Sequence, residues 1–206
     1  MILHNYDLYE DCFRVRLLAS CTEQSLELVN VNAFPGAEEK SAPYLKLNPL
    51  GRLPILEDGE LCLRNLSAIL IYVAEQDAQK RFIPKDSAER ARMMDWLGFA
   101  CQDLSVATEA RAVALLDAPG DVAVLRAKAR QLFRILDDHL TRQSLRGEIY
   151  VAGKSPSLAD IALFPAFALC RDFNLDHDEF PAARLWARQI RTLPGFITMP
   201  GIPDYH

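Results

Sequence analysis

A stretch of alternating turn signals and apolar residues, from Asn48 to Tyr72, constrains the fold of this chain more than any other. Its opening Asn48-Pro49 predicts a turn, because proline disfavours a helical conformation in the residue before it. An apolar strand over Leu53–Leu56 follows, and Asp58-Gly59 is typical of a tight hairpin that returns the chain through Leu61-Cys62-Leu63. The stretch therefore predicts two antiparallel strands joined by a short turn.

Two residues of this stretch carry further information. Pro54 stands at the start of the predicted strand, where its missing N–H costs least, and a proline flanked by turns is a place where a cis peptide bond is found. Asn65 can cap a helix, since apolar residues recur after it at helical spacing. These residues are Leu66, Ile69, Leu70, Val73 and Ala74.

The residues before this stretch predict a βαβ unit. Met1–Tyr6 has the pattern of a strand, Phe13–Ala19 that of a helix, and Ser25–Asn32 that of a second strand, parallel to the first. One helical turn is expected over Pro43–Leu47. The residues expected on the inner face of the second strand are Leu26, Leu28, and Val29 or Val31.

The rest of the chain has helical periodicity only. Long helices are predicted over residues 90–116 and 121–145, and we expect these two to form an antiparallel pair. Ser157 and Asp160 have the spacing of a capping box, and the apolar run after them predicts a buried central helix. A last helix is expected over residues 180–193.

Three motifs together resemble the glutathione transferase superfamily. The string NPLGRLPILEDGELCL is similar to the part of the glutathione-binding domain that surrounds its cis-proline. Ser157–Ala162 resembles the helix-starting box of the second domain, and Leu193–Phe196 resembles the close of its last helices. The resemblance implies an α/β thioredoxin-like domain over residues 1–76, a linker over 77–86 and an all-α domain over 87–206. It also implies a homodimer that uses glutathione as cosubstrate.

Charge and cysteine content exclude several other classes of function. The 206 residues carry a formal net charge of −5, which disfavours binding to nucleic acid or to an anionic membrane surface. The start of the chain lacks the basic and long apolar segments of a signal peptide, so we expect a cytoplasmic protein with no membrane segment. Five cysteines without a Cys-x-x-Cys pair indicate free thiols, and no residue spacing indicates a metal site.

Three residues are candidates for activating the thiol of glutathione. The loop between the first strand and the first helix favours an anion such as a thiolate, because helix N–H groups and the positive end of the helix dipole lie there. The resemblance assigns the catalytic position to Tyr9, whose phenol can donate a hydrogen bond to a thiolate. Cys12 could itself form a low-pKa thiolate, although Glu10 and Asp11 oppose this by charge repulsion. Tyr6 is the third candidate.

Glutathione recognition in the superfamily depends on two further places. The resemblance implies that Leu53, before Pro54, exchanges backbone hydrogen bonds with the cysteinyl part of the ligand. An acidic residue followed by serine receives the γ-glutamyl group in the superfamily, but this chain has Asn65-Leu66, with Ser67 one residue late. Loss of both partners would remove about 2 to 4 kcal/mol of binding free energy.

The sequence thus leaves two functional hypotheses. The first is a transferase that reacts the glutathione thiolate with a small hydrophobic electrophile, bound between Tyr9 and residues 101–107. The alternative is a non-catalytic binding or interaction module that keeps the fold but has a degraded glutathione site. The changes at Tyr9 and Asn65-Leu66 motivate this alternative.

Overall fold

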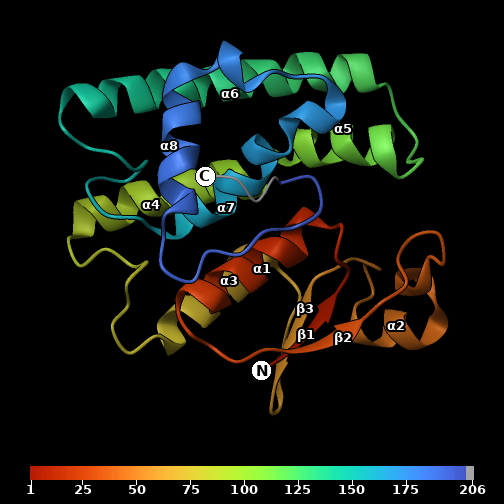
Figure 1. Ribbon diagram of the computed structural model, residues 1–206. Coiled ribbons are helices and arrows are strands. Elements are labelled where there is room, and N and C mark those ends of the chain that lie inside the picture. Colours follow the sequence, from red (N-terminus) through yellow and green to blue (C-terminus); the bar gives the residue numbers. More distant parts are fainter. Residues whose placement is uncertain (203–206) are drawn as a thin grey trace.

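A computed structural model describes residues 1–202 of the protein (Figure 1). A four-stranded sheet in its first half is built from β1 (Ile2–Asn5), β2 (Glu27–Asn30), β3 (Ile55–Asp58) and β4 (Leu61–Leu63). The strand order is β2-β1-β3-β4. β1 is parallel to β2, whereas β1 with β3 and β3 with β4 are antiparallel. The predicted βαβ unit and the predicted hairpin are both confirmed.

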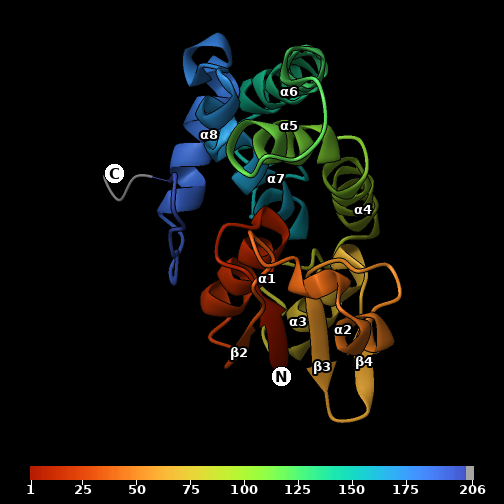
Figure 2. The same ribbon diagram turned by 90° about the vertical axis from the view of Figure 1, so that its right-hand side faces the viewer.

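Three helices accompany the sheet. α1 (Glu10–Cys21) and α3 (Leu66–Gln76) pack against each other and lie between the sheet and the C-terminal helices (Figure 2). α2 (Ala42–Leu47) follows the short helix η1 (Glu38–Lys40) and packs against it. Asn65 caps α3 as predicted, because its side chain accepts the Ala68 N–H at 3.3 Å.

The prediction for the second strand was wrong in its extent and in the residues that it buries. β2 covers only Glu27–Asn30, and Leu28 and Val29 are 44% and 39% exposed. The reason is the place of β2 at the edge of the sheet, next to β1 alone. Val31, directly after the strand, is buried as one of the expected alternatives.

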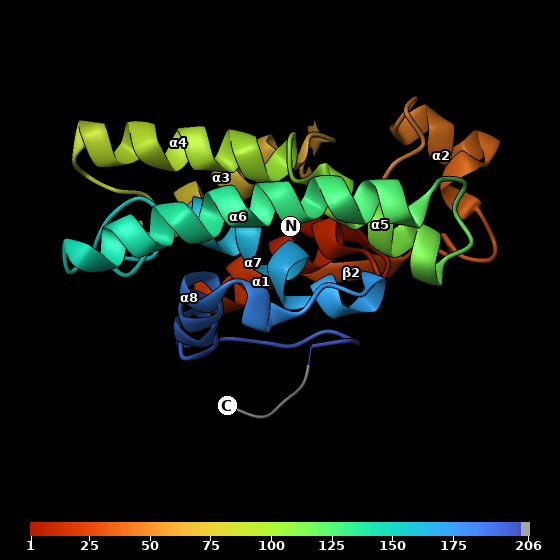
Figure 3. The ribbon, with the colours of Figure 1, turned by 90° about the horizontal axis from the view of Figure 1, so that it is seen from above.

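Within the described residues, the second half of the chain forms helices and no strand: α4 (Ser87–Cys101), α5 (Ser105–Leu115), α6 (Val122–Leu145), α7 (Leu158–Ala168) and α8 (Pro181–Arg191). Two short helices, η2 (Cys170–Phe173) and η3 (His177–Glu179), connect the last two. α5 packs along α6, and α4 packs against α7 (Figure 3). No helix within residues 1–202 has both the length and the apolar character needed to cross a bilayer.

The predicted single helix over residues 90–116 was wrong, because the chain turns between α4 and α5. At this turn the Leu104 N–H donates to the Phe99 carbonyl at 2.9 Å, and the Ser105 hydroxyl donates to the Gln102 carbonyl at 2.7 Å. Leu104 and the residues on either side at helical spacing stay buried, so the apolar periodicity continues across the break. The expected pairing of the two long segments changes as well: α6 packs against α5 and α8, whereas α4 packs against α7.

α7 is the central helix of the second domain, and every one of its residues is buried. The predicted capping box is present: Asp160 accepts the backbone N–H and the hydroxyl of Ser157, each at 2.8 Å. α7 also packs against α1, so one buried helix joins the two domains.

Candidate functional site

A cavity of about 240 Å³ lies where the N-terminus of α1, η1, the loop before β3 and α5 meet. Both domains therefore contribute to its walls. Its lining from the first domain is Leu8, Tyr9, Glu10, Asp11, Glu39, Lys40, Gly51, Arg52 and Leu53, and from the second Thr108, Arg111, Ala112 and Leu116.

Tyr9 is half-buried in the wall of this cavity and is the N-cap residue of α1. Burial raises the pKa of its phenol, and the negative charge of Glu39 raises it further. The phenol therefore stays protonated at neutral pH and can donate a hydrogen bond. Within residues 1–202 its hydroxyl forms no hydrogen bond, so the donor is available to a ligand.

The two alternative candidates have other surroundings. Cys12 is fully buried in a small core beneath the loop, and burial raises the pKa of its thiol to about 12. The Tyr6 hydroxyl donates to the Phe34 carbonyl at 3.0 Å, and its ring meets that of Tyr9 edge-on at 5.0 Å. Neither residue lines the cavity, which favours Tyr9 among the three.

Leu53 brings a backbone segment with unused hydrogen-bonding groups to the cavity. The Leu53–Pro54 peptide bond is cis, as the sequence indicated. β3 begins only at Ile55, and among the described residues no hydrogen bond joins the backbone of Leu53 to another residue. Because buried backbone groups are rarely left unpaired, a ligand with an extended backbone is the natural partner for this segment.

The three residues at the start of α3 are not among those that line this cavity. Asn65, Leu66 and Ser67 are absent from its lining. The Asn65 side chain instead serves the chain itself, accepting the Ala68 N–H and, at 2.6 Å, the Ser67 hydroxyl. No carboxylate stands at this position, as the sequence had indicated.

Three charged residues of the cavity wall escaped the sequence analysis. Glu39 is only 7% exposed, yet its carboxylate has neither a hydrogen bond nor an ion pair with any residue in the described part of the chain. The Lys40 ammonium donates to the Gly51 carbonyl at 2.5 Å, and Arg52 is exposed beside it. The only signal in the sequence was the placement of acidic and basic residues on both sides of the predicted turn at residue 48.

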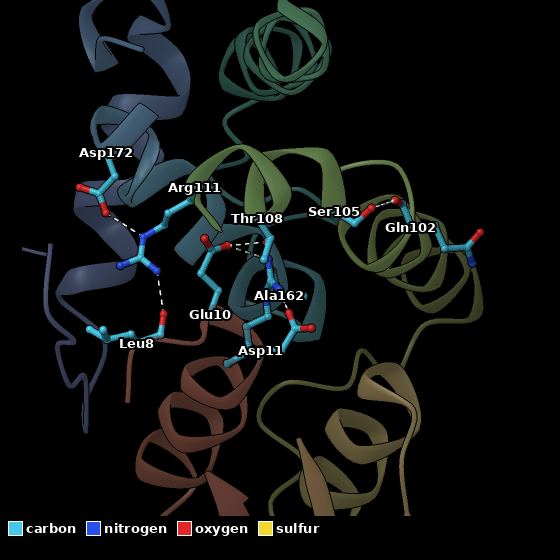
Figure 4. A network of polar contacts seen from close by, with 10 residues as sticks. Leu8, Glu10, Asp11, Gln102, Ser105, Thr108, Arg111, Ala162 and Asp172 are labelled. Carbon is cyan, nitrogen blue, oxygen red and sulfur yellow. Dashed lines mark hydrogen bonds and ion pairs between the residues drawn. The ribbon is translucent and has the colours of Figure 1, made fainter. Parts of the chain in front are cut away.

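A buried polar network joins the two domains beside Tyr9 (Figure 4). The Thr108 hydroxyl donates to Glu10 Oε2 at 2.7 Å. Arg111 donates through Nη1 to the Leu8 carbonyl and through Nε to the Asp172 carboxylate, each at 2.7 Å. Burial raises the pKa of Glu10, and the charges of Arg14 and Arg111 oppose this shift.

The predicted wall for an acceptor was wrong in its position on the helices. The cavity meets the later turns of α5, from Thr108 to Leu116, and none of residues 101–107 lines it. The turn after α4 explains the difference, because it directs Leu104 and Ala107 into the core, where both are fully buried. Within residues 1–202 no group of three or more His, Cys, Asp or Glu side chains could hold a metal ion.

Comparison with known proteins identifies the family of this chain. The family model "Glutathione S-transferase, N-terminal domain" matches residues 1–75, and "Glutathione S-transferase, C-terminal domain" matches residues 87–189. The probable maleylacetoacetate isomerase of Vibrio cholerae is 30% identical, over 95% of this chain and 93% of its own length.

Solved structures share the fold. A possible glutathione S-transferase from Rhodopseudomonas palustris superposes with a TM-score of 0.85 at 24% identity, over 100% of this chain and 92% of the other. The glutathione transferase URE2P8 from Phanerochaete chrysosporium, solved with oxidized glutathione, has a TM-score of 0.82 at 21% identity, over 94% of this chain and 90% of the other. The family matches and the relative that is similar along nearly its whole length show that this chain belongs to the glutathione S-transferase family.

Proposed function

We propose that the protein is a glutathione-dependent transferase that reacts the glutathione thiolate with a small electrophile. One observation carries the proposal: a free phenol donor, Tyr9, and an unpaired backbone segment, Leu53, share the walls of one cavity. Membership of the family, and the oxidized glutathione bound by a structural neighbour, support the same ligand here.

Each part of the ligand has a partner of suitable chemistry. The backbone of Leu53 pairs with the cysteinyl residue in the manner of an added strand. Lys40 and Arg52 supply the positive charge for a ligand carboxylate. Tyr9 donates its hydroxyl hydrogen to the sulfur, which favours the thiolate over the thiol and so lowers the pKa of the thiol.

The electrophile occupies the apolar part of the cavity, next to Leu8, Ala112 and Leu116. The cavity volume of about 240 Å³ suits a small molecule as this substrate. Maleylacetoacetate belongs in the assay panel, because a relative carries the name of its probable isomerase.

Replacement of Tyr9 tests the catalytic role. Tyr9→Phe removes the donor and keeps the ring, so turnover should fall roughly ten- to a thousandfold with little change in glutathione affinity. Tyr6→Phe is the matched control, because the Tyr6 hydroxyl bonds to Phe34 and lies outside the cavity lining. An unchanged rate in Tyr9→Phe would contradict the assignment, and Cys12→Ala would then be examined.

A second candidate function is a non-catalytic binding or interaction module. Asn65-Leu66 favours it, since neither side chain offers the carboxylate or hydroxyl that the superfamily uses for the γ-glutamyl group. Such a protein would keep the fold and the dimer and would not bind glutathione.

The assembly, the location and the domain boundaries are proposed with the function. We place the linker at residues 77–86, since α3 ends at Gln76 and α4 begins at Ser87. A cytoplasmic homodimer that binds neither nucleic acid nor membrane agrees with the net charge of −5. Sedimentation at micromolar concentration should give the mass of two chains, and a strict monomer would contradict the dimer.

A further inference from the structure

The two residues that flank Tyr9 are both held by α5. On one side, the Leu8 carbonyl accepts a hydrogen bond from Arg111 Nη1 at 2.7 Å. On the other side, the Glu10 carboxylate accepts the Thr108 hydroxyl at 2.7 Å. Figure 4 shows both contacts reaching from the helix above to the loop and helix below.

Thr108 and Arg111 can act together because they stand three residues apart on one helix. Side chains at this spacing share a face and project in the same direction. Their acceptors, at positions 8 and 10, stand on either side of the N-cap of α1. The two donors on α5 therefore hold the Leu8 carbonyl on one side of Tyr9 and the Glu10 side chain on the other.

The two contacts from α5 are buried, which limits the movement of the side chains that form them. The Arg111 side chain is 5% exposed, and its Nε is held by Asp172 of η2, so its guanidinium has little freedom to move. Glu10 is 2% exposed and also lies 3.8 Å from the Arg14 guanidinium. A buried charge that loses a partner is costly, so neither contact breaks easily.

We propose that Thr108 and Arg111 are positioning residues that hold the Tyr9 hydroxyl at the sulfur of the bound thiol. This inference rests on the proposed function, because it acts through Tyr9. The helical domain then has a role in activating the thiol, in addition to forming a wall of the cavity. A misplacement of about 1 Å by a change outside the reacting groups can cost on the order of a hundredfold in rate.

The experiment measures the pKa of glutathione bound to the protein, from the absorbance of the thiolate against pH, together with kcat and the Kd for glutathione. The variants are Thr108→Val, Arg111→Met and the milder Arg111→Lys, each made in the wild-type chain and in Tyr9→Phe. Thr108→Ser is the rescue variant, because it keeps the hydroxyl.

Two control variants remove comparable contacts elsewhere. Ser105→Ala removes a hydroxyl one turn earlier on α5, which donates to the Gln102 carbonyl. Arg126→Met removes an arginine that donates to the Phe173 carbonyl at 2.7 Å, at the same short helix η2. Neither contact touches residues 8–10, so both controls should match the wild type in thiol pKa.

In the wild-type background, Thr108→Val and Arg111→Met should raise the pKa of the bound thiol and lower kcat about tenfold or more, with Kd changed less than about threefold. In the Tyr9→Phe background the same changes should have no further effect on the thiol pKa, since the group that they position is gone. In Arg111→Lys the pKa of the bound thiol and kcat should lie between those of Arg111→Met and the wild type. Thr108→Ser should restore the wild-type values of both.

The outcomes distinguish the positioning role of Thr108 and Arg111 from the catalytic role of Tyr9. Equal shifts in both backgrounds, or no shift in either, would overturn the positioning role and leave the proposed function intact. A wild-type thiol pKa in Tyr9→Phe itself would overturn the role of Tyr9 and this inference with it.

Discussion

The Trp186 indole N–H of α8 donates to Asp160 Oδ1 at 2.8 Å, so the carboxylate in the capping box of α7 also holds the last long helix. Asp160 accepts three further hydrogen bonds, from the Val151 N–H at 3.0 Å and from the N–H and hydroxyl of Ser157. All of these donors meet at one fully buried carboxylate. The carboxylate thus joins the start of the central helix of the second domain to α8 and to the loop before it.

Asp160→Asn should lower the free energy of unfolding by about 2 to 4 kcal/mol, because an amide nitrogen would face donors in a buried site. Urea denaturation measures this change. Asp138→Asn, at an exposed position of α6, is the control and should stay within about 0.5 kcal/mol of the wild type. A small effect at Asp160 would mean that the network is not required for stability.

Replacement of Glu39 should stabilise the protein, in contrast to replacement of Asp160. Its carboxylate is buried without a partner, which opposes folding, so Glu39→Gln should raise the free energy of unfolding of the ligand-free protein by about 1 kcal/mol or more. Thermal unfolding would then shift upward by about 2 to 4 °C for a chain of this size. Glu38→Gln is the neighbouring control. A lower melting temperature in Glu39→Gln would show that this carboxylate has a stabilising partner.

Buried thiols should make the protein sensitive to alkaline pH. Burial raises the pKa of Cys12 and of Cys170 to about 12, whereas an unfolded thiol has a pKa of about 8.5. Below about pH 8.5 the thiol is protonated in both the folded and the unfolded state, so its full contribution to the free energy of unfolding is present. As the pH rises toward about 12, the thiol ionises only in the unfolded state, and this contribution is lost. Each thiol should therefore lower the free energy of unfolding by about 1.4 kcal/mol per pH unit above pH 9.

Cys12→Ala isolates this effect from the titration of other groups. Urea denaturation of the variant and of the wild type at a series of pH values should give a shallower decline for the variant above about pH 9. Identical slopes would indicate that Cys12 ionises at its ordinary pKa in the folded protein, and would restore it as a candidate nucleophile.

Local sequence signals predicted the parts of the fold that neighbouring residues determine. The hairpin at Asp58-Gly59, the cap at Asn65 and the box at Ser157 and Asp160 each depend on contacts within a few residues, and all are present. The break between α4 and α5 could not be predicted in this way. Buried residues continue at helical spacing across it, so burial hides the change of direction.

In the candidate site, too, local motifs could be predicted from the sequence and contacts between distant residues could not. Tyr9 and Leu53 could be named from motifs, whereas the contacts from Thr108 to Glu10 and from Arg111 to Leu8 join residues 98 and 103 positions apart. A polar pair three residues apart in an apolar helix was the only signal, and it does not identify its partners. The Glu39 carboxylate likewise could not be placed in the cavity wall from the sequence, because its surroundings come from segments distant in the chain.

Restoring the superfamily pattern at the start of α3 tests why glutathione should bind weakly. The double change Asn65→Glu with Leu66→Ser supplies a carboxylate for the γ-glutamyl ammonium and a hydroxyl for its carboxylate. We expect a gain of about tenfold or more in glutathione affinity, measured by calorimetry. Leu66→Ser alone is the control for the hydroxyl. No gain in the double variant would mean that this chain holds its ligand by other groups.

Calorimetric titration of the wild-type protein with glutathione tests the central claim most directly, because it does not depend on finding the right electrophile. The account predicts saturable binding, and a Kd tighter than about 100 µM would exclude the non-catalytic module. No binding at several millimolar glutathione would contradict the account, since the proposed transferase would then lack its cosubstrate.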